Sequence, residues 1–101
     1  MKAQTYNYET WIEESNPIKL SYIKQLLIEA GFCVLDSMDY HFKPQGYSCL
    51  YLLSESHLSI HTFPEESCSN IQLSSCVQKP FDKFIQLFNS VKIGEVNGYA
   101  K

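Results

Sequence analysis

The sequence predicts an α+β fold, a two-layer sandwich in which an antiparallel sheet carries two helices on one face. Two stretches place apolar residues at helical spacing, and most of the remaining chain is β-rich and divided by short turns. Turns of hairpin length favour an antiparallel sheet with both helices on the same side. The length of 101 residues predicts one domain spanning residues 1–101.

The first helix is expected at residues 17–30. Asn16 can cap it, Pro17 suits its first position, and Gly31 ends the apolar run. The second helix is expected to start at Pro80. Each helix has an apolar stripe that we expect in the core. The stripes are Tyr22, Ile23, Leu26, Leu27 and Ala30 in the first helix, and Phe81, Phe84, Ile85 and Phe88 in the second.

Strand-like segments fill the rest of the chain. They are expected at residues 4–12, 32–42, 47–53, 58–62 and 71–77, with a last one at 92–96. Pro44-Gln45-Gly46 is a turn signal, and Pro64 ends the fourth segment. Alternate residues of a strand face opposite sides, so Ser59 and His61 should share one face while Leu58, Ile60 and Thr62 share the other.

Composition and charge exclude several classes of function. The net charge is −3 with scattered lysines, which argues against nucleic-acid binding. No apolar run approaches the roughly 18 residues of a membrane span, and residues 1–10 are polar and aromatic, unlike the apolar region of a signal peptide. We therefore expect no membrane partner and a cytoplasmic location. The four cysteines form no metal-binding pattern and should be reduced, with Cys33 and Cys49 as small buried side chains.

Chemistry-bearing residues gather in residues 53–65, which hold two histidines, two glutamates and three serines. Buried polar groups need partners, so such clustering indicates a site more than a strand with a solvated polar face. A Ser59–His61 nucleophile pair is one interpretation, although no G-x-S-x-G elbow is present. Metal binding by His57 and His61 is a weaker interpretation, because on a strand these two residues stand about 13 Å apart, too far to hold one ion. We expect no metal.

This segment resembles the self-processing site of the prokaryotic S-adenosylmethionine decarboxylases. The similar stretch is Ser54-Glu55-Ser56-His57-Leu58-Ser59-Ile60-His61-Thr62-Phe63-Pro64-Glu65. Two further features match at the family's spacing: the block Phe42-Lys43-Pro44-Gln45-Gly46, and Cys76 twenty residues after Ser56. The resemblance therefore covers residues 42–76.

The resemblance implies self-cleavage between Glu55 and Ser56, which converts Ser56 into a pyruvoyl group. Ser56 Oγ would attack the Glu55 carbonyl to give an ester, whose elimination and hydrolysis leave the new carbonyl. That group would form a Schiff base with the substrate amine, because protein side chains offer no sink for the carbanion of a decarboxylation. His61 and Ser48 would assist the cleavage, and Cys76 would donate the proton in turnover.

The resemblance also implies how a substrate would be held. Glu65 would bind the ribose hydroxyls of S-adenosylmethionine, and Phe42 and Phe63 would flank the substrate. His57 is either a further site contact or a satisfied strand histidine. A chain of this size has little room for a deep cleft, so a homodimer of cleaved protomers is expected, with Phe42 reaching in from the partner.

The expected product is the aminopropyl donor for spermidine. Gln72 stands where the family carries an acidic residue, which motivates a second interpretation in which the same scaffold decarboxylates arginine or ornithine. A third is a non-enzymatic homologue that never cuts itself.

Overall fold

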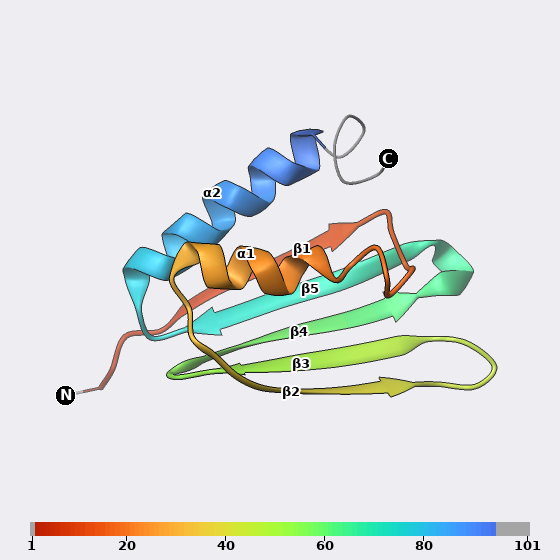
Figure 1. Ribbon diagram of the computed structural model, residues 1–101, viewed down its shortest axis with the longest axis horizontal. Helices are drawn as coiled ribbons and strands as arrows, with labels where there is room; N and C mark the ends of the chain where they lie inside the picture. Colours follow the sequence, from red (N-terminus) through yellow and green to blue (C-terminus); the bar gives the residue numbers. More distant parts are fainter. Residues whose placement is uncertain (1, 95–101) are drawn as a thin grey trace.

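A computed structural model of the protein describes residues 2–94 as a five-stranded antiparallel sheet with two helices on one face (Figure 1). The strand order is β1-β5-β4-β3-β2, so the first strand pairs with the last. The predicted fold class is confirmed. The elements are β1 (Tyr6–Ile12), α1 (Tyr22–Ala30), β2 (Val34–His41), β3 (Tyr47–Leu53), β4 (Ser56–Phe63), the 3-10 turn η1 (Pro64–Glu66), β5 (Cys68–Ser75) and α2 (Gln78–Gly94).

The core lies between the helices and the sheet, and both predicted helical stripes contribute to it. Alternate residues of the three central strands point into it, as their burial patterns show. Phe84 and Phe88 stack with ring centroids 5.6 Å apart and are fully buried. Each such side chain stabilises the fold by about 1.5–3 kcal/mol. The most deeply buried apolar strand residues are Leu53, Leu58, Ile60, Ile71 and Leu73.

Two sequence expectations about the helix boundaries were wrong. Regular helix begins at Tyr22 and not at Pro17, because Asn16 closes a tight turn by accepting the N–H of Leu20 on its carbonyl and that of Ile18 on its side chain. Helix α2 extends through residues 92–94, where a strand was expected, since Val91 continues the apolar stripe of this helix. Residues 95 and 96 lie outside the described residues.

The exposure of the cysteines differs in part from expectation. Cys49 is buried as predicted, whereas Cys33 is exposed because it lies in the turn between α1 and β2, outside the packed layers. Cys68 is partly buried and Cys76 is exposed. All four thiols are free.

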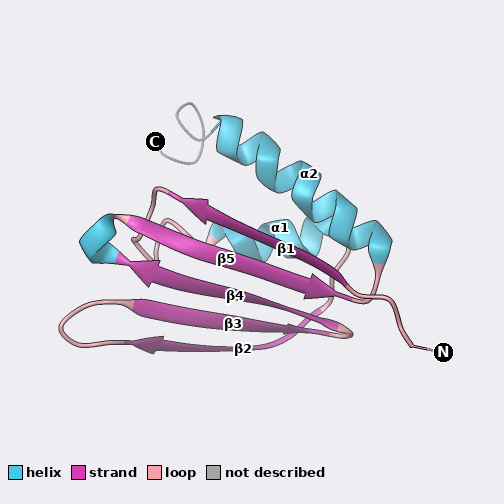
Figure 2. Ribbon diagram, turned by 180° about the vertical axis from the view of Figure 1, so that it is seen from behind, coloured by secondary structure: helices cyan, strands magenta, loops and turns pink. Residues whose placement is uncertain are grey.

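The second face of the sheet carries no helix, as the view from behind shows (Figure 2). Large apolar side chains on strands β2 and β3 are exposed there: Met38 is 74% exposed, Leu50 44% and Leu52 50%. Met38 pairs directly with Leu50 across the two strands. We call this apolar area of Met38, Leu50 and Leu52 the open face patch. Within residues 2–94, no helix combines the length and apolar character needed to cross a bilayer.

Candidate active site

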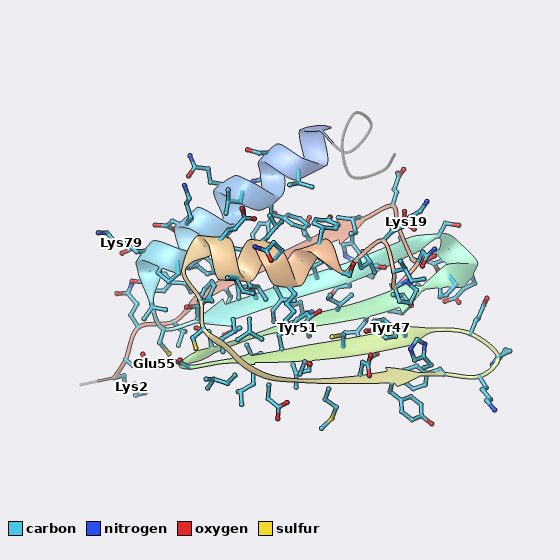
Figure 3. All side chains as sticks on the ribbon, in the orientation of Figure 1. Lys2, Lys19, Tyr47, Tyr51, Glu55 and Lys79 are labelled. Carbon is cyan, nitrogen blue, oxygen red and sulfur yellow. The ribbon has the colours of Figure 1, made fainter. Side chains whose placement is uncertain are left out.

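Ser56 opens β4, directly after the tight turn that joins it to β3. Its side chain points to the helix-covered face, where it is only 7% exposed. The Ser56 hydroxyl donates to Oγ of Ser75 at 2.7 Å. Glu55 precedes it and is exposed at this end of the sheet (Figure 3). We call this the cleavage end of the sheet.

Cys76 lies at the same end of the sheet, because the neighbouring strand β5 runs antiparallel to β4 and ends at Ser75, next to Ser56. Its backbone N–H donates to the carbonyl oxygen of Glu55 at 3.3 Å. The Cys76 thiol is exposed. The fold therefore brings Glu55, Ser56 and Cys76 together, although Cys76 lies twenty residues further along the chain.

Ser48 and His61 form a pair on the open face of the sheet. They stand opposite each other in the β3–β4 register, and Ser48 Oγ lies 2.8 Å from His61 Nδ1. The hydrogen-bond partner of His61 is thus Ser48 and not Ser59, which lies two residues away on the same face. A pocket of 310 Å³ contains the pair and is bordered by Met38 and Leu50 of the open face patch.

The Ser48–His61 pair does not meet Ser56 within one chain. Ser56 and His61 are five residues apart on β4, which corresponds to about 16 Å along a strand. Their side chains also face opposite sides of the sheet, with Ser56 buried under the helices and His61 exposed. A direct proton transfer between these two side chains of one chain is therefore excluded by geometry.

The residues expected to hold a substrate lie at the far end of the sheet from Ser56. Phe63 ends β4 and contacts Trp11, with ring centroids 5.5 Å apart. Glu65 is exposed in η1 and accepts a hydrogen bond from Gln45 Nε2 at 3.4 Å. In Figure 3 the label of Tyr47 marks this end, and that of Glu55 marks the cleavage end.

Phe42 lies one residue past the end of β2, in the turn to β3, whereas it was expected as the last residue of the strand. The turn itself was predicted by Pro44-Gln45-Gly46. Its ring contacts Tyr40, with centroids 4.8 Å apart, and is half exposed. Gly46 closes the turn with φ +117°, and its carbonyl accepts the Phe42 N–H at 2.8 Å. A side chain at position 46 would be strained in this left-handed conformation, so glycine maintains the turn that presents Phe42.

His57 is exposed on the open face, beside a pocket of 430 Å³ that Glu9 and Gln72 also line. Gln72 takes the position where the resemblance expects an acid, and β1 places a carboxylate next to it. Oε2 of Glu9 accepts hydrogen bonds from Gln72 at 3.2 Å and from Asn70 at 2.9 Å. Over the described part of the chain, no three His, Cys, Asp or Glu residues are placed to hold a metal ion.

Burial and nearby carboxylates keep several acidic groups near the site protonated. Partial burial, together with the charges of Glu66 and Glu65, raises the pKa of the Cys68 thiol. Burial is also the main cause of the raised pKa of Tyr47 and of Tyr51, and for Tyr47 the hydrogen bond to Asp39 adds to it. At neutral pH these side chains therefore stay protonated, and they release a proton less readily than an ordinary phenol or thiol.

Sequence reasoning missed Ser75, which contacts Ser56 directly. Two serines precede Cys76, and the pattern of the chain does not say which of them points inward. The strand register does, because Ser75 pairs with Ser56 while Ser74 pairs with His57 on the open face. The sequence signal that could have found it is that Ile71, Leu73 and Ser75 follow at every second position, so that all three share one face of a strand.

Comparison with known proteins supports the resemblance over nearly the whole chain. The sequence profile of the S-adenosylmethionine decarboxylase family matches residues 6–97. An S-adenosylmethionine decarboxylase proenzyme of Archaeoglobus fulgidus is 28% identical over 91 residues, which are 85% of this chain and 81% of that protein. One from Thermotoga petrophila is 35% identical over 77 residues, 74% of this chain and 59% of that protein.

A third relative, a proenzyme of the same name from Brevibacillus brevis, is 44% identical over 59 residues, 54% of this chain and 44% of that protein. The matched residues thus cover between 44% and 81% of the length of these three relatives. The crystal structure of the adenosylmethionine decarboxylase from Aquifex aeolicus shares the fold, with a TM-score of 0.60, 24% identity, and coverage of 88% of this chain and 83% of that one. The chain belongs to the S-adenosylmethionine decarboxylase family.

Proposed function

We propose that the chain is a proenzyme that cuts itself between Glu55 and Ser56 and then decarboxylates S-adenosylmethionine. One observation carries the proposal: the Ser56 hydroxyl, the Glu55 carbonyl and Cys76 converge at the cleavage end of the sheet. Family membership favours this reaction over the decarboxylation of arginine or ornithine, and over an unprocessed homologue.

The cleavage chemistry uses only atoms of the chain and one water molecule. Ser56 Oγ attacks the Glu55 carbonyl carbon, the C–N bond breaks, and the freed amine takes the hydroxyl proton, leaving an ester. Removal of the Ser56 α-proton then expels the Glu55 carboxylate and leaves a dehydroalanine. Its tautomer is hydrolysed by water, which releases ammonia and leaves the pyruvoyl group. Serine suits this sequence because its oxygen both attacks and departs.

The site fits a pyruvoyl group because that group is built from the backbone and Cβ of Ser56 itself and is no larger than serine. Its carbonyl supplies the electron sink that decarboxylation requires. Cys76 lies alongside, with an exposed thiol and its N–H directed at Glu55. A positioned thiol can act as a general acid, so Cys76 is suited to protonate the substrate carbon after CO2 leaves.

Two copies of the chain are needed to complete the site. The Ser48–His61 pair lies on the opposite face from Ser56, and the expected substrate residues lie at the opposite end of the sheet. A two-fold dimer whose open faces meet in antiparallel orientation would bring one chain's cleavage end to the other chain's Glu65 end. The open face patch supports this arrangement, since a stable monomer rarely leaves such side chains uncovered.

At the Glu65 end the side chains match the parts of S-adenosylmethionine. A carboxylate accepts hydrogen bonds from two ribose hydroxyls, and Glu65 is exposed and steadied by Gln45. Phe42 and Phe63 offer aromatic faces, which attract both an adenine ring and a sulfonium cation. His57 borders the open face as a further contact for the bound substrate.

Intact-mass spectrometry of the purified chain tests the proposal. We expect a fragment of residues 1–55 and a fragment of residues 56–101 that is lighter than a serine-ended peptide by one ammonia. Borohydride should change the mass of the second fragment alone. The processed protein should release CO2 from S-adenosylmethionine, and not from arginine or ornithine. A chain that stays full length after long incubation at neutral pH contradicts the proposal.

A further inference from the structure

We infer that Ser75 is a positioning residue for self-cleavage, holding the Ser56 hydroxyl in the orientation from which it attacks Glu55. The inference rests on the proposed function and assigns a role to a side chain outside the site predicted from sequence. Ser75 Oγ lies 2.7 Å from Ser56 Oγ, and the two residues face each other in the β4–β5 register. Ser75 is only 1% exposed.

The hydroxyl of Ser75 is itself fixed by the backbone that follows it. It donates to the carbonyl oxygen of Val77 at 3.0 Å and accepts the Val77 N–H at 3.0 Å. Because its own proton is committed to Val77, Ser75 can meet Ser56 only as an acceptor. The Ser56 proton therefore points at Ser75, which leaves the lone pairs of Ser56 Oγ free for the attack.

The surroundings leave Ser56 few alternative hydrogen-bond partners. The neighbouring side chains on this face of the sheet belong to Leu53, Leu58 and Leu73, which are fully buried and apolar. A buried hydroxyl in apolar surroundings retains the one hydrogen bond available to it. Ser75 thus selects one orientation of Ser56 where solvent would allow several.

The same short segment holds both reacting groups. Ser75 binds the nucleophile Ser56, while the next residue, Cys76, donates its N–H to the Glu55 carbonyl oxygen at 3.3 Å. That oxygen gains negative charge when Ser56 attacks, so a fixed N–H at this position stabilises the developing charge. Residues 75–77 therefore hold the hydroxyl and the carbonyl in a fixed mutual position, which is the main requirement of an intramolecular attack.

Ser75 is not the base of the reaction. A hydroxyl has no tendency to hold a second proton at neutral pH, and the backbone carbonyl that accepts from it cannot take one either. The proton ends on the freed amine of Ser56, and the group expected to carry it there is His61. Replacing Ser75 should therefore change the rate of cleavage and leave the shape of its pH profile unchanged.

The test compares the rate of self-cleavage of freshly translated precursor in Ser75→Ala, Ser75→Thr and Ser69→Ala. Ser69 is the matched control: it lies on the same strand and face, is fully buried, and donates to the Glu14 carbonyl at the far end of the sheet. We expect Ser75→Ala to cleave about 100-fold more slowly, as a misplaced reactant does. Ser75→Thr, which keeps the hydroxyl, should cleave within a few-fold of the parent, and Ser69→Ala at the parent rate.

Hydroxylamine, which cuts esters, identifies the stalled step. The slow Ser75→Ala precursor should remain an amide and yield no hydroxylamine fragment, with the same pH midpoint of cleavage as the parent. Parental cleavage in Ser75→Ala would overturn the inference, and so would equal slowing in Ser69→Ala. A parent chain that never cleaves would instead overturn the proposed function, so the two failures are distinguishable.

Discussion

The backbone N–H of Cys76 donates to the carbonyl oxygen of Glu55 at 3.3 Å. The residue proposed as proton donor in turnover is therefore also hydrogen-bonded to the peptide group that is cut. The contact uses the main chain of Cys76 and leaves its thiol exposed. Position 76 can therefore serve maturation through its backbone and catalysis through its side chain, and the two roles are separable by mutation.

Cys76→Ala should still cleave itself, because alanine keeps the N–H that binds Glu55. Decarboxylation should fall by about 10²–10⁴-fold, the usual contribution of a positioned proton donor. Fragment masses measure the cleavage, and CO2 release from S-adenosylmethionine measures turnover. Cys68→Ala is the control and should keep both self-cleavage and decarboxylation. If Cys76→Ala decarboxylates like the parent, the proton donor is another group.

His61 should act at the cleavage end of the partner, since within one chain His61 lies about 16 Å along β4 from Ser56. Neither Ser56→Ala nor His61→Ala should be processed efficiently alone. When the two variants are mixed as unfolded chains and refolded together, the His61→Ala chain should be cut by the partner's His61. Mass spectrometry resolves the two chains. The control replaces Ser56→Ala by the double variant Ser56→Ala/His61→Ala, and rescue there would refute action across the dimer.

Leu52→Glu should dissociate the proposed dimer. Leu52 lies in the open face patch, and a carboxylate buried between two sheets without a partner carries a large desolvation cost. We expect dimer affinity to weaken by about 100-fold or more, equivalent to roughly 3 kcal/mol. Light scattering measures the mass in solution. Ile18→Glu, at an exposed site beside α1, should remain dimeric, and a monomeric parent would contradict the arrangement.

Glu65→Gln should raise the KM for S-adenosylmethionine by about 10–100-fold, because hydrogen bonds to a charged group contribute about 1.5–3 kcal/mol. Self-cleavage should be unchanged, since Glu65 lies at the other end of the sheet from Ser56. The neighbouring Glu66→Gln is the control, as it is exposed in the same turn. Equal KM increases in both variants would point to a general charge effect and not to ribose binding.

Cys68 should react slowly with iodoacetamide. Partial burial and the carboxylates of Glu66 and Glu65 raise its pKa, so at a given pH the folded protein holds less thiolate than the unfolded chain. The midpoint of the pH–rate profile, followed by mass spectrometry, should lie at higher pH in the folded protein. In Glu66→Gln that midpoint should move down, because one repelling charge is lost. An equal midpoint in folded and unfolded protein would contradict this.

Most of the local structure and the identity of the reactive residues could be predicted from the sequence. Helical spacing identified both core stripes, and alternation placed Leu58 and Ile60 opposite Ser59 and His61. The 54–65 segment and Cys76 at its fixed distance pointed to the family that the comparisons then showed. Such signals are readable because they depend on spacing along the chain, which is set by the periods of helix and strand.

Which residues meet could not be predicted, because it depends on how the strands pair in the folded chain. Helical spacing could not exclude a helix from Pro17, and the strand-like character of residues 92–96 concealed that α2 continues to Gly94. The pairing of β5 with β4 brings Ser75 and Cys76 to Ser56, and the pairing of β3 with β4 gives His61 its partner Ser48. Contacts between strands depend on register, and register is fixed by which faces are buried together, a property of the whole sheet and not of any one segment.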